Sequence, residues 1–324
     1  MRDISIDSLK GFTMILVVVG HVIQTSFLDY NSHFLFRYIY SFHMPLFIFL
    51  SGYVVYKDDF VNNRFLRRKA IQLILPYFTW MIISSIILYL FKNGNFIDTL
   101  YGKIIFPDNG LWFLWILFFM HCGYFLFRKN IVVLISLFAA LFIFSLITGN
   151  VSNYFLYKTI PIYFIYYMFG VLIKKYLQTL LNSKNIRIIG LLVLCLSLFL
   201  VFPGNRVHEI LESMPSHIKE IDKIFISIIG ILSWFLLFKS FTKFSKIFLY
   251  IGKTSLAIYI LQSFCLMLVS KYIQYISNSE YYYFLLPIII FFIIAFCIII
   301  FKMLSMNKYS SFLLFGKTKT DLNS

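Results

Sequence analysis

The chain has 324 residues, of which 60% are hydrophobic and only 13% are charged. This composition excludes an ordinary soluble domain and is typical of a protein embedded in a lipid bilayer. The formal net charge of +16 does not indicate a nucleic-acid-binding surface, because the basic residues fall in short segments between apolar runs.

Ten apolar segments are each about as long as a bilayer requires, which predicts a single-domain, all-α, polytopic integral membrane protein. The segments are 8–28, 33–56, 71–91, 111–127, 131–148, 156–173, 187–203, 224–238, 254–275 and 283–303. Most of the 29 Lys and Arg residues fall on one side if the N-terminus is cytoplasmic, which predicts that both termini are cytoplasmic. The mixed segment 243–251 is expected to lie flat in the membrane interface, and the tail at about 304–324 to be interfacial or disordered.

The first apolar segment carries Asp7, Lys10 and His21 inside or at the edge of its apolar run. Lys10 and His21 are eleven residues apart, which on a helix is about 20° past three turns and about 16 Å of axial rise. Asp7 shares their face. Ionisable residues inside a span are costly and indicate a functional site. The alternatives are a Lys10 that reaches the interface, a His21 that is only hydrogen-bonded, and an Asp7 that pairs with Lys10 or caps the helix.

The second segment contains His43 and Pro45 in the run FHMPLFIFLSGY. Because this helix runs opposite to the first, His43 is expected within roughly one turn of His21 in depth. Proline has no N–H to donate to the carbonyl of Ser41, so the helix should bend there and leave an acceptor free.

The later segments hold fewer candidates. The run RFLRRK at 64–69 fits the basic flank of a cytoplasmic loop. In the fourth segment, Trp112 and His121 are either packing residues or contacts to a cavity or acceptor. His33, His208 and His217 are expected in solvated loops, and the histidine spacing indicates no metal site. Four cysteines in apolar runs are interpreted as buried packing residues, with no disulfide framework: Cys122, Cys195, Cys265 and Cys297.

The pattern IDSLKG…VVVGH followed by FHMPLFIFLSGY resembles the membrane-bound acyltransferase-3 family, and within it the fucose 4-O-acetylase-like subgroup. That family carries a basic residue, ten residues, and then a histidine, which here are Lys10 and His21. Weaker matches are LWFL at 111–114, IPIYFIYYMFGVLIKK at 160–175 and IGKTSLAIYIL at 251–261. Two positions depart from the family: Lys10 stands where Arg is commoner, and Gln262 where many relatives have His.

The resemblance implies O-acyl transfer, with acetyl as the expected group, from acetyl-coenzyme A to a sugar hydroxyl. The implied acceptor is a bacterial surface polysaccharide or its polyprenyl-linked precursor, and the implied location is the bacterial inner membrane. Imidazole titrates near neutrality, so His21 would act as a general base or carry the acyl group itself. The residues implied around it are His43 and Asp7 in the catalytic site, and Lys10, Arg67 and Arg68 as contacts to coenzyme A.

The main rival interpretation is a transporter or flippase of lipid-linked saccharides, which would also be polytopic and basic. Transporters often contain paired halves with broken helices at matching positions, and the sequence has no such repeat. A third possibility is a non-catalytic scaffold for glycan assembly. The sequence leaves the oligomeric state open, and no metal cofactor is expected.

Overall fold

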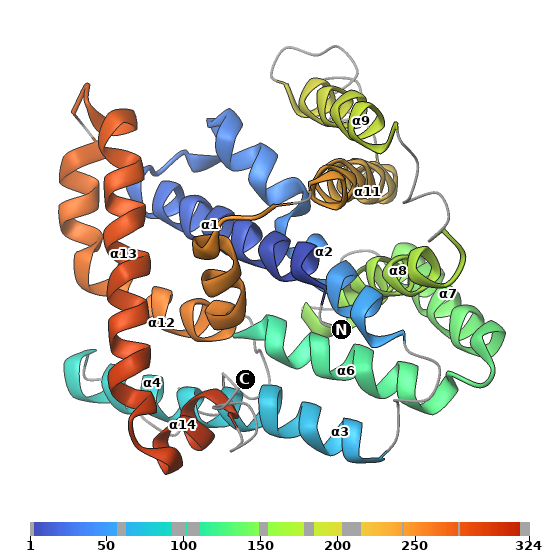
Figure 1. The fold of residues 1–324 in the computed structure, drawn as a ribbon, viewed down its shortest axis with the longest axis horizontal. Coiled ribbons are helices and arrows are strands. Elements are labelled where there is room, and N and C mark those ends of the chain that lie inside the picture. The colour runs from blue at the N-terminus through green and yellow to red at the C-terminus, as the bar shows by residue number, and fades with distance from the viewer. Residues whose placement is uncertain are drawn as a thin grey trace. The chain divides into compact units, whose positions relative to one another are not determined.

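The computed structural model describes residues 3–56, 63–92, 102, 111–148, 155–177, 185–202, 215–241, 243–277 and 279–317. Every element within these ranges is helical, which confirms the all-α fold class (Figure 1). The elements in chain order are α1 (Ile4–Ser26), η1 (Tyr30–Ser32), α2 (Phe34–Val55), α3 (Asn63–Lys69), η2 (Ala70–Ile74), α4 (Leu75–Lys92), α6 (Trp112–Phe127), α7 (Ile131–Thr148), α8 (Phe155–Tyr176), α9 (Ile186–Val201), α11 (Ser216–Ser240), α12 (Lys246–Ser277), α13 (Tyr282–Ser305) and α14 (Lys308–Phe315).

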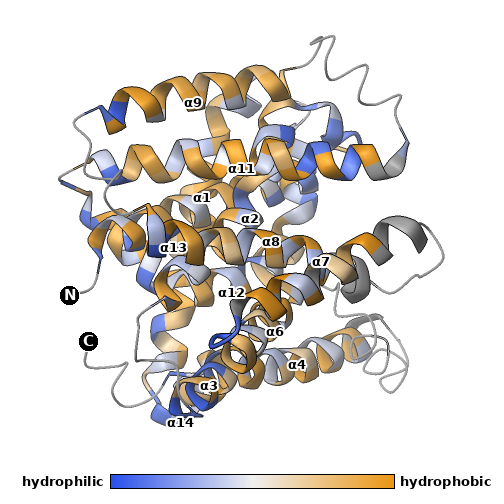
Figure 2. Ribbon diagram, turned by 90° about the vertical axis from the view of Figure 1, so that its right-hand side faces the viewer, coloured by the Kyte–Doolittle hydropathy of each residue, from blue (hydrophilic) through white to orange (hydrophobic). Residues whose placement is uncertain are grey.

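A helix covers each of the ten apolar segments, although the helix ends differ from the predicted ends by several residues. Among the described residues, six helices are long and apolar enough to cross a membrane, and α6 and α9 are apolar but shorter. Hydrophobic residues run along most of α9 and α11 in Figure 2. The chain is therefore a multi-pass helical membrane protein. The span count of ten and the cytoplasmic side of both termini stay predictions.

The chain packs as two compact units. The first combines Met1–Val54 with Met168–Phe301, and the second combines Val55–Tyr167 with Lys302–Ser324. The first unit holds α1, α9, α11 and α12 with nearly all of α2 and α13, and the second holds α3, α4, α6, α7 and α14. Each unit is thus assembled from segments that lie far apart in the sequence.

In the first unit, α1 packs along α12 through a contact lined by two glycines (Figure 1). A Cβ atom added to Gly11 would lie 2.0 Å from the carbonyl oxygen of Phe248, and one added to Gly252 would lie 2.0 Å from that of Asp7. Such distances exclude any side chain, so the two backbones touch directly, as small residues allow in membrane helix pairs.

This contact corrects the expectation for 243–251, which is not a separate interfacial element. Residues 246–251 are the first turns of α12, and the helix continues without a break to Ser277. The ring of Phe248 packs edge-on against Phe12 of α1, with 6.3 Å between ring centroids. Phe248 is thus held against α1, whereas Ile247 and Tyr250 of the same turns are exposed.

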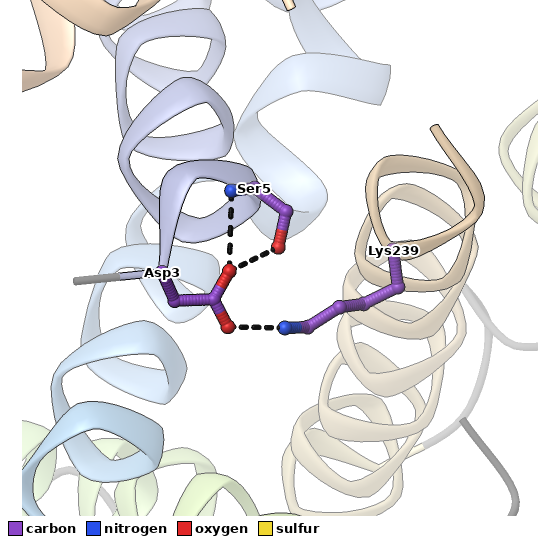
Figure 3. A network of polar contacts seen from close by, with 3 residues as sticks. All are labelled: Asp3, Ser5 and Lys239. Atoms are coloured by element: carbon purple, nitrogen blue, oxygen red, sulfur yellow. Dashed lines mark hydrogen bonds and ion pairs between the residues drawn. The ribbon is translucent and has the colours of Figure 1, made fainter. Parts of the chain in front are cut away.

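The first turn of α1 is fixed by Asp3 (Figure 3). One carboxylate oxygen accepts from the backbone N–H and the hydroxyl of Ser5, at 3.1 and 2.6 Å, and the other accepts from Lys239 Nζ at 2.5 Å. Lys239 lies in the last turn of α11, so this ion pair joins the start of α1 to the end of α11. Asp3 is the N-cap, and the alternative in which Asp7 caps the helix was wrong.

In the second unit, α3 continues into α4 through the π-helical segment η2. Helix α14 packs against α4, where Trp80 Nε1 donates to the carbonyl oxygen of Leu314 at 2.8 Å. Gly316 ends α14 with a φ of 60°, and a Cβ atom there would lie 2.2 Å from the carbonyl oxygen of Ile71. Residues 308–317 of the tail are therefore packed, while 318–324 lie outside the described residues.

We expect Gly11→Ala to lower the free energy of unfolding by about 1–3 kcal/mol, because the new methyl group must displace a backbone carbonyl of α12. Thermal unfolding of the purified protein in detergent measures the effect. Gly102→Ala is the control, since a Cβ atom at Gly102 meets nothing within 4 Å. Equal unfolding temperatures for the two variants would show that α1 and α12 are not in backbone contact.

We expect the Asp3–Lys239 pair to make stability depend on acid pH. Burial raises the pKa of the Asp3 carboxyl, but the hydrogen bonds from Lys239 and Ser5 lower it by more, so it lies below the ordinary 3.8. A depressed carboxyl pKa stabilises the fold above that ordinary value, and the contribution disappears as the pH falls through the lowered pKa.

The measurement is unfolding of the wild type and Lys239→Met across this pH range. The loss should be about 0.5 kcal/mol larger at neutral pH than in acid, because the pair is partly exposed, while the contacts of Lys239 with the rings of Tyr53 and Phe235 do not depend on Asp3. Lys243→Met, which removes an exposed lysine from the following loop, should show no such pH dependence. A pH-independent loss in Lys239→Met would contradict this assignment.

Candidate functional site

Helix α1 is uninterrupted from Ile4 to Ser26, so it carries Asp7, Lys10 and His21 on one regular helix. Its geometry sets about 16 Å of axial rise between Lys10 and His21. Asp7 is buried, whereas Lys10 and His21 are partly exposed. The three residues therefore lie on one continuous helix, as the sequence predicts, and their roles stay predictions.

The ring of His21 lies beside two polar side chains. Its Nδ1 atom is 3.2 Å from Oε1 of Gln24, one turn further along α1, and 3.3 Å from the hydroxyl oxygen of Tyr40 on α2. The Tyr40 hydroxyl also donates to Gln24 Oε1 at 3.1 Å. The three groups form a closed triangle of polar contacts at the end of α1.

Tyr40 also connects His21 with His43. The centroid of the Tyr40 ring is 6.2 Å from that of His21 and 4.6 Å from that of His43. His43 is only 3% exposed, and its Nδ1 atom is 2.8 Å from the carbonyl oxygen of Ile39. The two histidines singled out from the sequence thus both contact one tyrosine ring.

Sequence analysis did not identify Tyr40 or Gln24. Gln24 lies three residues after His21, a spacing that puts side chains in contact on a helix, so this signal was available. Tyr40 belongs to another helix and fits because Gly20 leaves room for it, since a Cβ atom at Gly20 would be 2.6 Å from Cε2 of the tyrosine. The glycine of the VVVGH motif therefore has a steric role.

The carbonyl of Ser41, which Pro45 cannot bond, receives a hydrogen bond from another helix. Pro45 lies inside α2, and the carbonyl oxygen of Ser41 accepts a hydrogen bond from the hydroxyl of Ser227 on α11 at 2.5 Å. A Cβ atom at Gly230, one turn further along α11, would lie 2.7 Å from Cβ of Phe42. Helix α11 therefore packs closely on α2 where the proline opens the backbone.

Arg67, Arg68 and Trp112 belong to the second unit. Both arginines are exposed in the last turn of α3, where their guanidinium groups could contact phosphates. Trp112 is the first residue of α6, and its ring centroid lies 5.4 Å from that of Tyr163. The candidates for the acyl-donor contact are thus divided between two units.

His121, also in the second unit, is buried with 2% of its surface exposed. Its Nδ1 atom is 2.9 Å from the hydroxyl of Tyr167, and Phe65 packs edge-on at 5.5 Å between centroids. These contacts supply the partner that the sequence did not reveal. They fit a packed, hydrogen-bonded histidine.

The expectation that His33 and His217 lie in solvated loops needs correction. His33 is half-buried, because its ring stacks on Phe27 at 4.1 Å and its Nδ1 atom lies 3.0 Å from the hydroxyl of Tyr283. His217 lies in the first turn of α11 instead of a loop, and His208 lies outside the described residues.

The cysteines also differ from one another. Cys265 and Cys297 are buried with their sulfur atoms 3.5 Å apart, while Cys122 is half-buried. Cys195 is exposed on α9, so it was wrongly placed in the interior. Its helix is apolar on its outer surface as well, which hides the difference in the sequence. Gln262 is 2% exposed, and its carbonyl oxygen has no hydrogen-bond partner among the described residues.

Helices of membrane-spanning length that carry ionisable side chains, among them His21 and His43, define a polytopic helical membrane protein. The sequence model of the acyltransferase domain matches residues 3–306. The chain therefore belongs to the acyltransferase-3 family.

Two curated relatives are both named nodulation protein NolL. The protein from Sinorhizobium fredii is 28% identical over 202 residues, covering 57% of this chain and 53% of its own length. The protein from Mesorhizobium japonicum is 32% identical over 130 residues, covering 36% of this chain and 34% of its own. The chain thus spans about half, or less, of the relatives it matches. No solved structure matches it.

We expect Ser227→Ala to lower the free energy of unfolding by about 1 kcal/mol, because the Ser41 carbonyl loses its donor where no water replaces it. Ser85→Ala is the control, since that buried hydroxyl bonds the carbonyl of Met81, four residues earlier in its own helix. Thermal unfolding in detergent compares the two. A larger loss in the control would contradict the role given to Ser227.

Proposed function

We propose that this protein transfers an acetyl group from acetyl-coenzyme A to a hydroxyl of a saccharide. The acceptor is a bacterial surface polysaccharide or its lipid-linked precursor, handled by a multi-pass protein of the inner membrane. The observation that carries the proposal is the family match over residues 3–306 together with a histidine, His21, on the same helix as Lys10.

In the proposed reaction the acceptor oxygen attacks the thioester carbonyl while His21 takes the hydroxyl proton. The new C–O ester bond forms, the C–S bond breaks, and coenzyme A leaves as a thiol with the proton from His21. Transfer through an acyl-imidazole is the other route open to the same residue. His43, which shares the Tyr40 contact, is the second imidazole proposed for the catalytic site, and Asp7 is proposed with them.

The donor is proposed to extend along α1. Lys10 would contact the phosphates of coenzyme A near the cytoplasmic interface, with the thioester close to His21. The axial rise of about 16 Å between the two residues is on the order of an extended pantetheine arm. Arg67 and Arg68, both exposed, are further candidates for phosphate contacts. His121 and Trp112 remain candidates for cavity or acceptor contacts, and the fucose 4-O-acetylase-like subgroup suggests a sugar acceptor.

We expect Lys10→Ala chiefly to raise the KM for acetyl-coenzyme A, and His21→Ala chiefly to lower kcat by about a hundredfold or more. A phosphate contact contributes equally to the ground and transition states, whereas proton transfer matters only in the latter. The measurement is release of coenzyme A by the purified protein, with mass spectrometry of the surface glycan to identify the acetylated sugar.

Lys308→Ala, at an exposed lysine of α14, is the control for loss of charge, and His33→Ala is the control for loss of an imidazole. Neither should change either constant by more than about twofold. Equal losses of kcat in Lys10→Ala and His21→Ala, with unchanged KM, would contradict the division of roles. Loss of saccharide export in His21→Ala, without loss of acetyl transfer, would favour a transporter.

A further inference from the structure

The polar triangle around His21 restricts which ring nitrogen carries the proton. Oε1 of Gln24 is an acceptor and lies 3.2 Å from His21 Nδ1. The single proton of the Tyr40 hydroxyl is already donated to the same Oε1 atom. A lone pair on Nδ1 would therefore face the lone pairs of Gln24, whereas an N–H at Nδ1 gives Gln24 a second donor. The arrangement favours the Nδ1–H tautomer, with the lone pair on Nε2.

An independent contact gives His43 the same tautomer. A backbone carbonyl only accepts hydrogen bonds, so the 2.8 Å contact between His43 Nδ1 and the oxygen of Ile39 requires a proton on Nδ1. In both neutral rings the basic nitrogen is then Nε2. The ring of Tyr40 contacts both imidazoles.

Tyr40 itself is held in place from several sides. Its ring stacks on Phe36 at 3.9 Å between centroids, one turn earlier on α2, and it lies against Gly20 of α1, the residue before His21. The position of its hydroxyl thus follows from the packing of α1 on α2. Gln24, in contrast, is exposed, and its Oε1 atom is oriented by its contacts with His21 Nδ1 and the Tyr40 hydroxyl.

We propose that Gln24 and Tyr40 are positioning residues that hold the proton of His21 on Nδ1 and so make Nε2 the nitrogen that exchanges a proton with the acceptor hydroxyl. This inference deepens the proposed function and rests on it. Gln24 orients the base, in the way that a third group orients the histidine of a nucleophile–base pair. Tyr40 fixes Gln24 by donating to the oxygen that His21 also uses.

The kinetic test uses the purified full chain with acetyl-coenzyme A. Gln24→Ala and Tyr40→Phe should each lower kcat about tenfold and change the KM for the donor by less than about twofold. Gln24→Glu keeps an acceptor oxygen at the same reach and should recover most of the activity lost in Gln24→Ala. Tyr38→Phe is the control, because Tyr38 is also on α2 but its hydroxyl contacts Ser197 of α9 and Trp234 of α11. It should leave kcat unchanged.

A spectroscopic test is independent of turnover. In protein labelled with ¹⁵N-histidine, the His21 signals are assigned by their loss in His21→Asn, and the proton-bearing nitrogen is identified by its chemical shift. We expect a proton on Nδ1 in the wild type and a mixture of tautomers in Gln24→Ala. A proton on Nε2 in the wild type would overturn the proposal, as would a wild-type kcat in both Gln24→Ala and Tyr40→Phe.

Different results would refute the proposed function and the positioning role of Gln24 and Tyr40. If the wild type shows the Nδ1–H tautomer but no acyl transfer to any saccharide, the proposed function is wrong, and with it the catalytic purpose given to Gln24 and Tyr40. If acyl transfer occurs and depends on His21 but not on Gln24 or Tyr40, only the positioning role is wrong.

Discussion

The contact of α1 with α12 through Gly11 and Gly252 is the constraint on which the first unit depends. Because no side chain separates the two backbones, α1 cannot slide or rotate without a clash against the carbonyl of Phe248 or Asp7. Asp7, Lys10 and His21 lie on this one helix, so its register sets where they point. The ion pair of Asp3 with Lys239 fixes the beginning of the same helix.

A second constraint is the need to satisfy polar groups without water. In hydrocarbon an unpaired donor or acceptor costs several kcal/mol, so polar side chains in spans need partners from the protein. The Ser41 carbonyl, which Pro45 cannot bond, accepts a hydrogen bond from the Ser227 hydroxyl. The Nδ1 atom of His43 contacts the carbonyl oxygen of Ile39. Gln262 differs, since its buried carbonyl oxygen has no partner among the described residues.

The proposed chemistry joins these two constraints. A histidine acts as a general base through the nitrogen that carries a lone pair, and a hydrogen bond at the other nitrogen orients the ring. Here an amide oxygen from the same helix and a hydroxyl from a neighbouring helix meet at His21. The small volume of Gly20 lets the second helix come close enough to provide that hydroxyl.

The sequence by itself determined the helical, membrane-spanning class, because the length and apolarity of a span are local properties of the chain. It also determined the 11-residue spacing of Lys10 and His21 and the open carbonyl beside Pro45, since helix geometry and the missing proline N–H depend on nothing else. Only the tertiary structure decided which groups meet across helices. Tyr40 reaches His21, and Ser227 lies 186 residues from the Ser41 carbonyl that it bonds. Such pairings depend on how close two helices come, which small residues such as Gly20 and Gly230 set and which no local pattern encodes.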